Sequence, residues 1–169
     1  RCGDLPDIDL PEIADIRPYL DAAVAAAEGR GRLLGLDDAR FGPTFGWNRD
    51  PRTGVIAPSV RGKAIDYRDE SLVGDIKYLW EPNRHLHLVT LAQAHALSGN
   101  ASYFHVLRLH LESWFDSCPY RMGPNWTSAL EVAIRLINWS VAWQILGGAH
   151  SPLFQTNEGA RLRQRWLES

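Results

Sequence analysis

Apolar residues recur at helical spacing in three long stretches of the chain, and the stretch at 128–146 is apolar on most of its circumference. Its two apolar stripes are Leu130, Ile134, Ile137 and Val141, and Val132, Leu136, Trp139, Trp143 and Leu146. Because such a helix is normally packed on several sides, we expect 128–146 to be an inner helix. Ser128 predicts its N-cap with Glu131 as capping-box partner, and Gly147 predicts its end.

The helix predicted at 83–97 also has little polar surface, and its polar residues gather at its N-terminal end. These are Glu81, Asn83, Arg84, His85 and His87. The helix predicted at 101–117 differs, because Leu107, Leu111 and Trp114 share one face while Arg108 and Glu112 share another. That amphipathic pattern indicates an outer helix. The alternation predicts an all-α fold of stacked antiparallel helical hairpins that curve into an incomplete (α/α) toroid.

The remaining segments predict the domain organisation. We expect an extended lead-in at 4–15, a helix from Pro18 to Glu28, a short extended piece at 32–36, and a last helix at 158–167. Pro82 predicts a break between a short helix at 76–80 and the helix at 83–97. Residues 37–74 are rich in Gly and Pro and carry interspersed aromatic residues, so we expect a long loop that packs. Residues 1–40 are therefore a lead-in and first helix, and 41–169 are part of one helical domain.

Composition narrows the classes of function. The chain has 169 residues, 45% hydrophobic and 22% charged, and a net charge of −2. Such totals are typical of a globular domain and give no bulk basic field for nucleic acid. We expect no membrane span, no cofactor and no metal site, because no long apolar run and no Cys/His zinc spacing occur. The chain lacks an initiator Met and stops inside a helical pattern, so we expect a piece of a longer protein that self-associates.

A polar stripe crosses the first turns of the apolar helix at 128–146. It consists of Glu131, Arg135 and Asn138, and Glu131 stands in the favourable position for an ion pair with Arg135. Asn125 and Trp126 precede the helix, where free backbone N–H groups favour anions. From the residues alone, an ion pair that fixes a core helix is the favoured interpretation. The alternative is an anion-binding cleft at this helix N-terminus.

Four motifs resemble one protein family. FGWNRDPRTG, YRDE, GDIKYLWEPNRHLHLVTLAQAHALSG and GPNWTSALEVAIRLINW occur in this order between residues 41 and 146. The stretch is similar to the N-terminal helical domain of heparinase II/III-like polysaccharide lyases, in particular heparinase III-like members. The resemblance implies an incomplete (α/α) toroid followed by a β-sandwich domain in the same chain. It also implies a periplasmic or secreted protein that cleaves an acidic, uronate-containing polysaccharide, heparin-like or alginate-like, by β-elimination.

The resemblance also assigns roles to residues. In heparinase III-like lyases the Asn of an Asn-Trp pair neutralises the uronate carboxylate, which makes Asn125 the candidate catalytic residue. The Tyr and His that act as base and acid lie further along such chains. This sequence has no counterpart of them, since Tyr120 precedes Asn125. We therefore expect no turnover from these 169 residues alone.

Several side chains near Asn125 are candidates for substrate binding, and we expect them to lie close together. Trp126 and Trp80 can stack on sugar rings, and Arg84 or Arg135 can hold a carboxylate or sulfate with paired hydrogen bonds. The other candidates at the same helix entrances are Asn83, His85 and Glu131. Two alternatives remain: a non-catalytic carbohydrate-binding or scaffold toroid, and a glycoside hydrolase that uses Glu81 and Glu131 as its two carboxylic acids.

Overall fold

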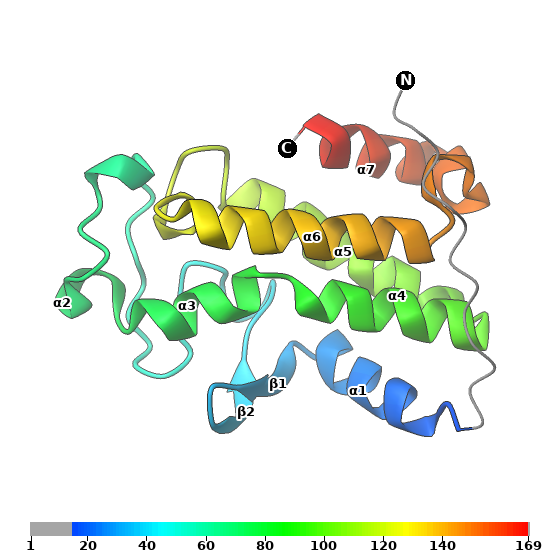
Figure 1. Ribbon diagram of the computed structural model, residues 1–169, viewed down its shortest axis with the longest axis horizontal. Helices are drawn as coiled ribbons and strands as arrows, with labels where there is room; N and C mark the ends of the chain where they lie inside the picture. The colour runs from blue at the N-terminus through cyan, green and yellow to red at the C-terminus, as the bar shows by residue number, and fades with distance from the viewer. Residues whose placement is uncertain (1–14, 169) are drawn as a thin grey trace.

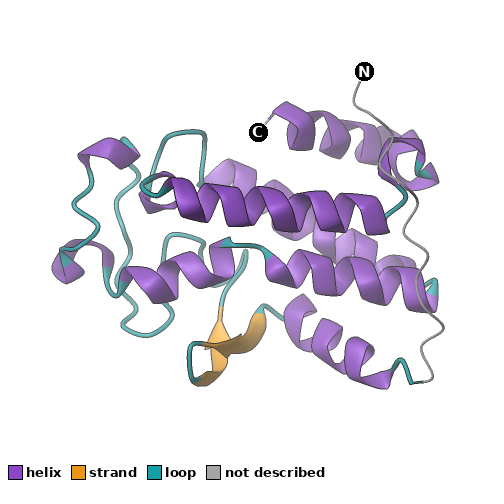
Figure 2. Ribbon diagram, viewed as in Figure 1, coloured by secondary structure: helices purple, strands orange, loops and turns teal. Residues whose placement is uncertain are grey.

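The computed structural model describes residues 15–168, which form a mostly helical fold with one small β-hairpin (Figure 2). The α-helices are α1 (Arg17–Ala27), α2 (Glu70–Val73), α3 (Ile76–Asn83), α4 (Leu86–Ser98), α5 (Ala101–Ser117), α6 (Ala129–Ile145) and α7 (Asn157–Glu168). The short 3₁₀ turns are η1 (Gly62–Ala64), η2 (Pro124–Trp126), η3 (Gly148–His150) and η4 (Pro152–Gln155), and the strands are β1 (Arg30–Leu33) and β2 (Leu36–Arg40). Most helix positions predicted from the sequence are therefore confirmed. The lead-in predicted at 4–15 lies, apart from its last residue, outside the described residues.

The long helices alternate in direction. In Figure 1, α4 and α6 run side by side in one direction, and α1, α5 and α7 run in the opposite direction. Short connections at Gly99 and at residues 118–128 join α4 to α5 and α5 to α6. This is the arrangement of stacked antiparallel helical hairpins that the sequence predicts.

The break between α3 and α4 falls later than the sequence predicts. Pro82 lies inside α3, which continues to Asn83, and the chain then turns at His85. Pro82 removes one backbone donor and so weakens the last turn, while His85 adopts a left-handed conformation with φ of 65°. A non-glycine residue with positive φ is strained, so the surrounding contacts must hold His85 in place.

The main core takes residues from α1, α4, α5, α6 and α7. From α4 it takes Leu88, Leu91 and Ala92, which are fully buried, so the helix that occupies most of the predicted range 83–97 has little exposed surface. From α5 it takes Leu107, Leu111, Trp114 and Phe115, while His105 and Asp116 on the other face are exposed. The amphipathic prediction for 101–117 is therefore confirmed.

The prediction that 128–146 is buried on several sides is wrong for the described chain. Helix α6 buries its polar stripe, Glu131 and Arg135, together with Trp139 and Ala142, and exposes its apolar stripe. The exposed apolar residues are Leu130, Leu136, Ile137 and Val141. The cost of burying the polar stripe is offset because Glu131 and Arg135 both have hydrogen-bonding partners inside the fold.

The segment between α1 and α3 packs through its aromatic residues, as expected. Phe41 and Trp47 join the main core, while Ala57, Ile65, Val73 and Leu79 form a second, smaller core. The all-α prediction needs one correction, since β1 and β2 form an antiparallel hairpin. Leu34 and Gly35 both have positive φ, as a tight two-residue hairpin turn requires.

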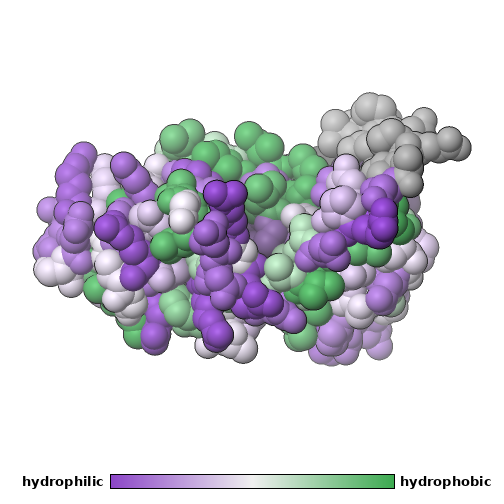
Figure 3. Space-filling model, turned by 90° about the horizontal axis from the view of Figure 1, so that it is seen from below, coloured by the Kyte–Doolittle hydropathy of each residue, from purple (hydrophilic) through white to green (hydrophobic). Residues whose placement is uncertain are grey.

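The molecular surface around the hairpin and α1 mixes polar and apolar groups. Figure 3, seen from below, shows hydrophilic residues over the left and centre and apolar residues along the upper edge. No helix in the described part of the chain is both long and apolar enough to span a bilayer. Cys118 is a free, buried thiol, whereas Cys2 lies outside the described residues.

Candidate functional site at the start of α6

Two loops, around Gly62 and around Gly123, are hydrogen-bonded to each other near the N-terminal end of α6. The Gly62 N–H donates to the carbonyl of Arg121 (2.8 Å), and the Gly123 N–H donates to the carbonyl of Val60 (2.7 Å). A Cβ atom on Gly62 would lie 3.1 Å from the Gly123 carbonyl oxygen, so the loops approach as closely as a glycine permits. Ser128 is the N-cap of α6, as predicted, but its side chain makes no capping hydrogen bond.

Asn125 lies beneath these loops with no exposed surface. Its Nδ2 donates to Asn48 Oδ1 (3.0 Å) and to Cys118 Sγ (3.3 Å), while its Oδ1 is buried without a partner in the described chain. Both amide donors therefore serve the protein interior. In this conformation the Asn125 side chain fixes the loop and is not open to a polysaccharide.

The buried Arg135 side chain connects the end of α3 with the turn η2 that precedes α6. Its Nε donates to the carbonyl of Asn83 (2.8 Å), and its Nη2 donates to the carbonyl of Asn125 (3.0 Å). The guanidinium also lies over the rings of Trp114 and Trp126, 4.5 and 5.3 Å from their centroids. Burial lowers the pKa of Arg135 to about 10, so the group stays charged at neutral pH.

The predicted hydrogen-bonded ion pair between Glu131 and Arg135 does not form. The Glu131 carboxylate instead accepts two hydrogen bonds from Arg84, from Nε at 2.7 Å and from Nη2 at 2.9 Å. Arg84 Nη1 also donates to Glu81 Oε2 at 2.5 Å. The hydrogen bond with Glu131 raises the pKa of Arg84. Arg84, the residue that follows α3, thus replaces Arg135 as the hydrogen-bonding partner of Glu131.

The remaining candidates also take part in internal contacts. Asn83 donates from Nδ2 to the carbonyls of Trp47 and Leu79, and its Oδ1 accepts from the Trp114 indole at 2.8 Å. His85 accepts from the Trp139 indole at 2.7 Å, and Trp80 donates to the carbonyl of Pro124 at 3.0 Å. The structure therefore brings the predicted site residues together, but as a network that holds α3, α4, α5 and α6.

An open groove lies on the outer side of this network, with a volume of about 500 Å³. We call it the α6 entrance groove. Its lining residues are Arg61, Lys63, Tyr120, Arg121, Trp126, Ala129 and Val132. None of its lining residues is acidic, and no ion pair in the described chain involves its three cationic side chains. The groove is therefore a local basic surface on a chain with a net charge of −2.

Two aromatic rings lie side by side in the groove. The rings of Tyr120 and Trp126 meet edge to face with centroids 5.1 Å apart, and Arg121 lies 4.9 Å from the Tyr120 centroid. Trp126 is anchored through its indole N–H, which donates to the carbonyl of Cys118 at 3.2 Å. Tyr120 is 64% exposed and is free to contact a ligand. Arg121 has a left-handed backbone with φ of 65°, a strained conformation of the kind found at functional sites.

Sequence reasoning found Trp126 but missed the basic residues of the groove. Arg61 and Lys63 flank Gly62, and Arg121 follows Tyr120, so the available signal was basic residues beside turn glycines and aromatic residues. Only the pairing of the two loops places Arg61 next to Met122 and brings these cations to one surface.

Residues 15–168 contain no group of three or more His, Cys, Asp or Glu side chains placed to hold a metal ion. Comparisons of the chain with protein-family models, with curated proteins and with solved structures find no match.

Proposed function

We propose that this chain binds an acidic polysaccharide in the α6 entrance groove. The observation that carries the proposal is the set of three cationic side chains, Arg61, Lys63 and Arg121, without a carboxylate among the groove's lining residues. Unpaired cations gathered on one surface attract an anionic polymer and raise its rate of encounter. Arginine also matches the planar geometry of carboxylate and sulfate oxygens with two parallel hydrogen bonds.

The aromatic residues of the groove favour a sugar polymer over other polyanions. Trp126 presents a ring whose orientation is fixed by its hydrogen bond to Cys118, and Tyr120 stands edge-on beside it. Pyranose rings have apolar faces that pack against flat aromatic surfaces, while their substituents reach outward to polar partners. Arg121, whose guanidinium lies over the Tyr120 ring, supplies a cation beside these aromatic residues.

We further propose that this binding serves β-elimination in a heparinase III-like polysaccharide lyase whose helical domain is a toroid. The support is the set of sequence motifs, together with α4 and α6 running in parallel with α5 behind them. In such a toroid the next helical hairpin would cover the exposed apolar stripe of α6. A direct catalytic role for Asn125 requires its amide to turn outward from Asn48 and Cys118. In the closed arrangement, Asn125 positions the loop that carries Trp126.

The second candidate function is a carbohydrate-binding domain without catalysis. The buried Asn125 amide favours it, because its Nδ2 donates to Asn48 and Cys118 inside the protein. The glycoside hydrolase alternative gains no support, because Glu81 and Glu131 both bind the same guanidinium of Arg84 and Glu131 is buried. A hydrolase needs its two carboxylic acids on either side of the scissile bond.

The binding proposal is tested by the affinity of the chain for heparin and alginate, with dextran as a neutral polymer of similar flexibility. Lys63→Gln should weaken binding to the acidic polymers about five- to tenfold, as expected for the loss of one charged contact worth about 1 kcal/mol or slightly more. Lys77→Gln is the matched control, because Lys77 is exposed on α3 outside the groove. Equal losses in both variants, or equal binding of dextran, would reject the groove.

Catalysis is tested separately from binding. β-Elimination leaves an unsaturated uronate that absorbs near-ultraviolet light, whereas hydrolysis and simple binding do not produce it. We expect these residues alone to bind acidic polymers without such absorbance, since the Tyr and His expected as base and acid lie further along such chains. Absorbance that grows with time would show that the chain carries its own catalytic pair. Binding without absorbance in a longer chain that also contains the β-sandwich domain would favour the non-catalytic function.

A further inference from the structure

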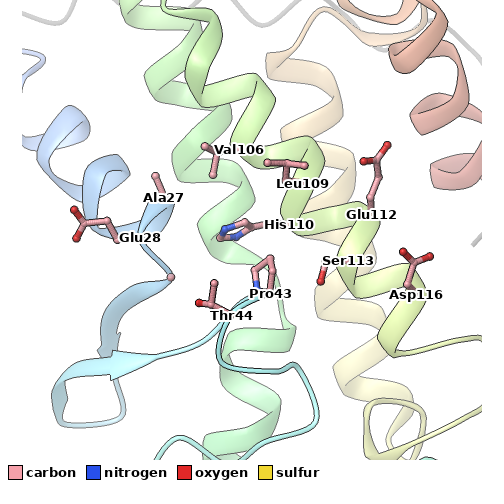
Figure 4. A pocket seen from close by; sticks show the side chains of 11 residues that line it. Ala27, Glu28, Pro43, Thr44, Val106, Leu109, His110, Glu112, Ser113 and Asp116 are labelled. Carbon is pink, nitrogen blue, oxygen red and sulfur yellow. The ribbon is translucent and has the colours of Figure 1, made fainter.

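A second pocket lies between α5 and the end of α1. We call it the α1–α5 pocket, and its volume is about 580 Å³. Figure 4 shows His110 at its centre, facing the chain around Thr44. The lining residues are Ala27, Glu28, Gly29, Pro43, Thr44, Val106, Leu109, His110, Glu112, Ser113 and Asp116. None of the residues discussed for the α6 entrance groove is among them.

His110 is a buried polar ring on α5 that packs against other aromatic rings. It is 5% exposed, and its ring meets Trp47 edge to face and His87 at a tilt, with centroids 6.0 and 5.5 Å away. Its Nδ1 has no hydrogen-bond partner in the described chain. Since a buried polar atom without a partner costs about 1–3 kcal/mol, the imidazole needs an explanation outside these packing contacts. Burial lowers the pKa of His110 to about 4, so the ring is neutral at pH 7.

Charge in and around the pocket is balanced. The three carboxylates at its rim each bind an arginine that is not a lining residue: Arg30 binds Glu28, Arg108 binds Glu112, and Arg165 binds Asp116. Figure 4 shows these carboxylates turned away from His110. No lysine or arginine lines the pocket, so an anionic ligand would find no cationic partner among the lining residues. A cation would meet carboxylates that are already paired.

The groups near His110 are neutral and hydrogen-bonding. Ser113 Oγ accepts from the Trp47 indole at 3.1 Å, which leaves its own hydrogen free to donate outward. The Thr44 hydroxyl stands opposite, and its residue is exposed to solvent. Val106, Leu109 and Pro43 supply apolar walls beside these groups. Neutral donors and acceptors next to apolar walls suit a ring that carries hydroxyl groups.

We propose that the α1–α5 pocket binds an uncharged polyhydroxylated ligand of the size of one sugar ring, with His110, Ser113 and Thr44 as its hydrogen-bonding partners. This site is distinct from the α6 entrance groove, since one is lined by cations and the other by none. The two sites therefore respond in opposite ways to the charge of a ligand.

Three pyranosides that differ mainly in charge test the proposal: methyl glucoside, glucosamine and glucuronate. Binding is followed by ¹H–¹⁵N NMR, with the His110 imidazole and the backbone amides of α5 as reporters. We expect methyl glucoside to shift these signals with saturation, and glucuronate to bind at least about fivefold more weakly because no lining cation offsets the desolvation of its carboxylate. Glucosamine binding no more tightly than methyl glucoside supports the uncharged class. Tighter glucosamine binding, or no shift with methyl glucoside, overturns the proposal.

Conservative variants locate the bound sugar. Thr44→Val and Ser113→Ala each remove a hydroxyl group with little change of shape, and each should weaken methyl glucoside about fivefold, near the value of one net hydrogen bond. His110→Phe should abolish the shifts while the chain stays at least as stable, because it removes an unpartnered nitrogen. Arg121→Gln is the control, since it should weaken heparin and leave methyl glucoside unchanged. Unaltered sugar binding in both hydroxyl variants would place the ligand elsewhere.

Discussion

Replacement of Arg135 by Met tests whether the Arg135 guanidinium stabilises the fold or binds a ligand. Met has a similar length and no charge, so it fills the space of the aliphatic stem of Arg135. The variant loses the two hydrogen bonds that hold the carbonyls of Asn83 and Asn125, and it leaves both carbonyls buried. It also loses the contacts of the guanidinium with the rings of Trp114 and Trp126.

The expected cost follows from these contacts. Hydrogen bonds from a charged donor contribute about 1.5–3 kcal/mol each, and two of them give about 3–6 kcal/mol. The cation–π contacts add about 1 kcal/mol. Removal of the buried charge returns several kcal/mol of desolvation free energy, and the observed cost of breaking such buried arrangements is about 3–5 kcal/mol. We therefore expect Arg135→Met to lower the free energy of unfolding by about 3 kcal/mol and Tm by about 6–12 °C.

Urea unfolding followed by tryptophan fluorescence measures this change, because Trp114 and Trp126 touch the guanidinium directly. Arg135→Lys serves as the control: it keeps the charge but lacks the planar fork that reaches both carbonyls, so we expect an intermediate loss. A loss below about 1 kcal/mol for Arg135→Met, together with weaker heparin binding, would refute the structural role. It would restore the interpretation of Arg135 as a ligand-binding residue.

The remaining predictions concern pH, Asn125 and the loop contact. Burial lowers the pKa values of His85, His87 and His110, so the unfolded chain binds more protons than the folded chain as pH falls from about 6.5 toward 4. Stability is therefore complete above about pH 6.5 and declines below it, and an unchanged urea midpoint at pH 5 would contradict this. Asn125→Asp should destabilise more than Asn125→Ala in thermal unfolding, because it buries a carboxylate against Asn48 Oδ1; equal Tm values would argue against it. Gly62→Ala should weaken heparin binding, because the added methyl group would push the loop at Gly62 away from the loop at Gly123. Unchanged affinity would show that the two loops can accommodate the methyl group.

Local signals allowed most helices to be predicted. Pro18, Ser128 and Gly99 mark helix ends whose chemistry is contained in one or two neighbouring residues, and the observed ends fall within a residue or two of the predicted ones. The β-hairpin was missed because Leu34-Gly35 is not a typical hairpin dipeptide. Its pairing depends on contact between strands rather than on the residues of the turn.

Partners distant in sequence account for the errors at the site. The sequence offers Glu131 a partner one helical turn away in Arg135, but Arg84 becomes available only when the fold brings the end of α3 to the start of α6. From the sequence, Asn125 is a reasonable candidate for ligand binding. In the fold its amide group donates a hydrogen bond to Asn48, which lies on a separate loop. Periodicity likewise shows that α6 has apolar and polar faces, yet the choice of the buried face depends on whether Arg84 and two backbone carbonyls meet the polar one.

The central claim, that cations of the α6 entrance groove bind an acidic polysaccharide, is tested most directly by the salt dependence of heparin binding. Each cation that contacts the polymer releases counterions, so the slope of log K against log salt concentration reports how many contacts form. Comparison of the unmodified chain with the variant Arg61→Gln/Lys63→Gln/Arg121→Gln should show a slope reduced by about two to three, while Lys77→Gln leaves the slope unchanged. A triple variant with the slope and affinity of the unmodified chain would contradict the claim.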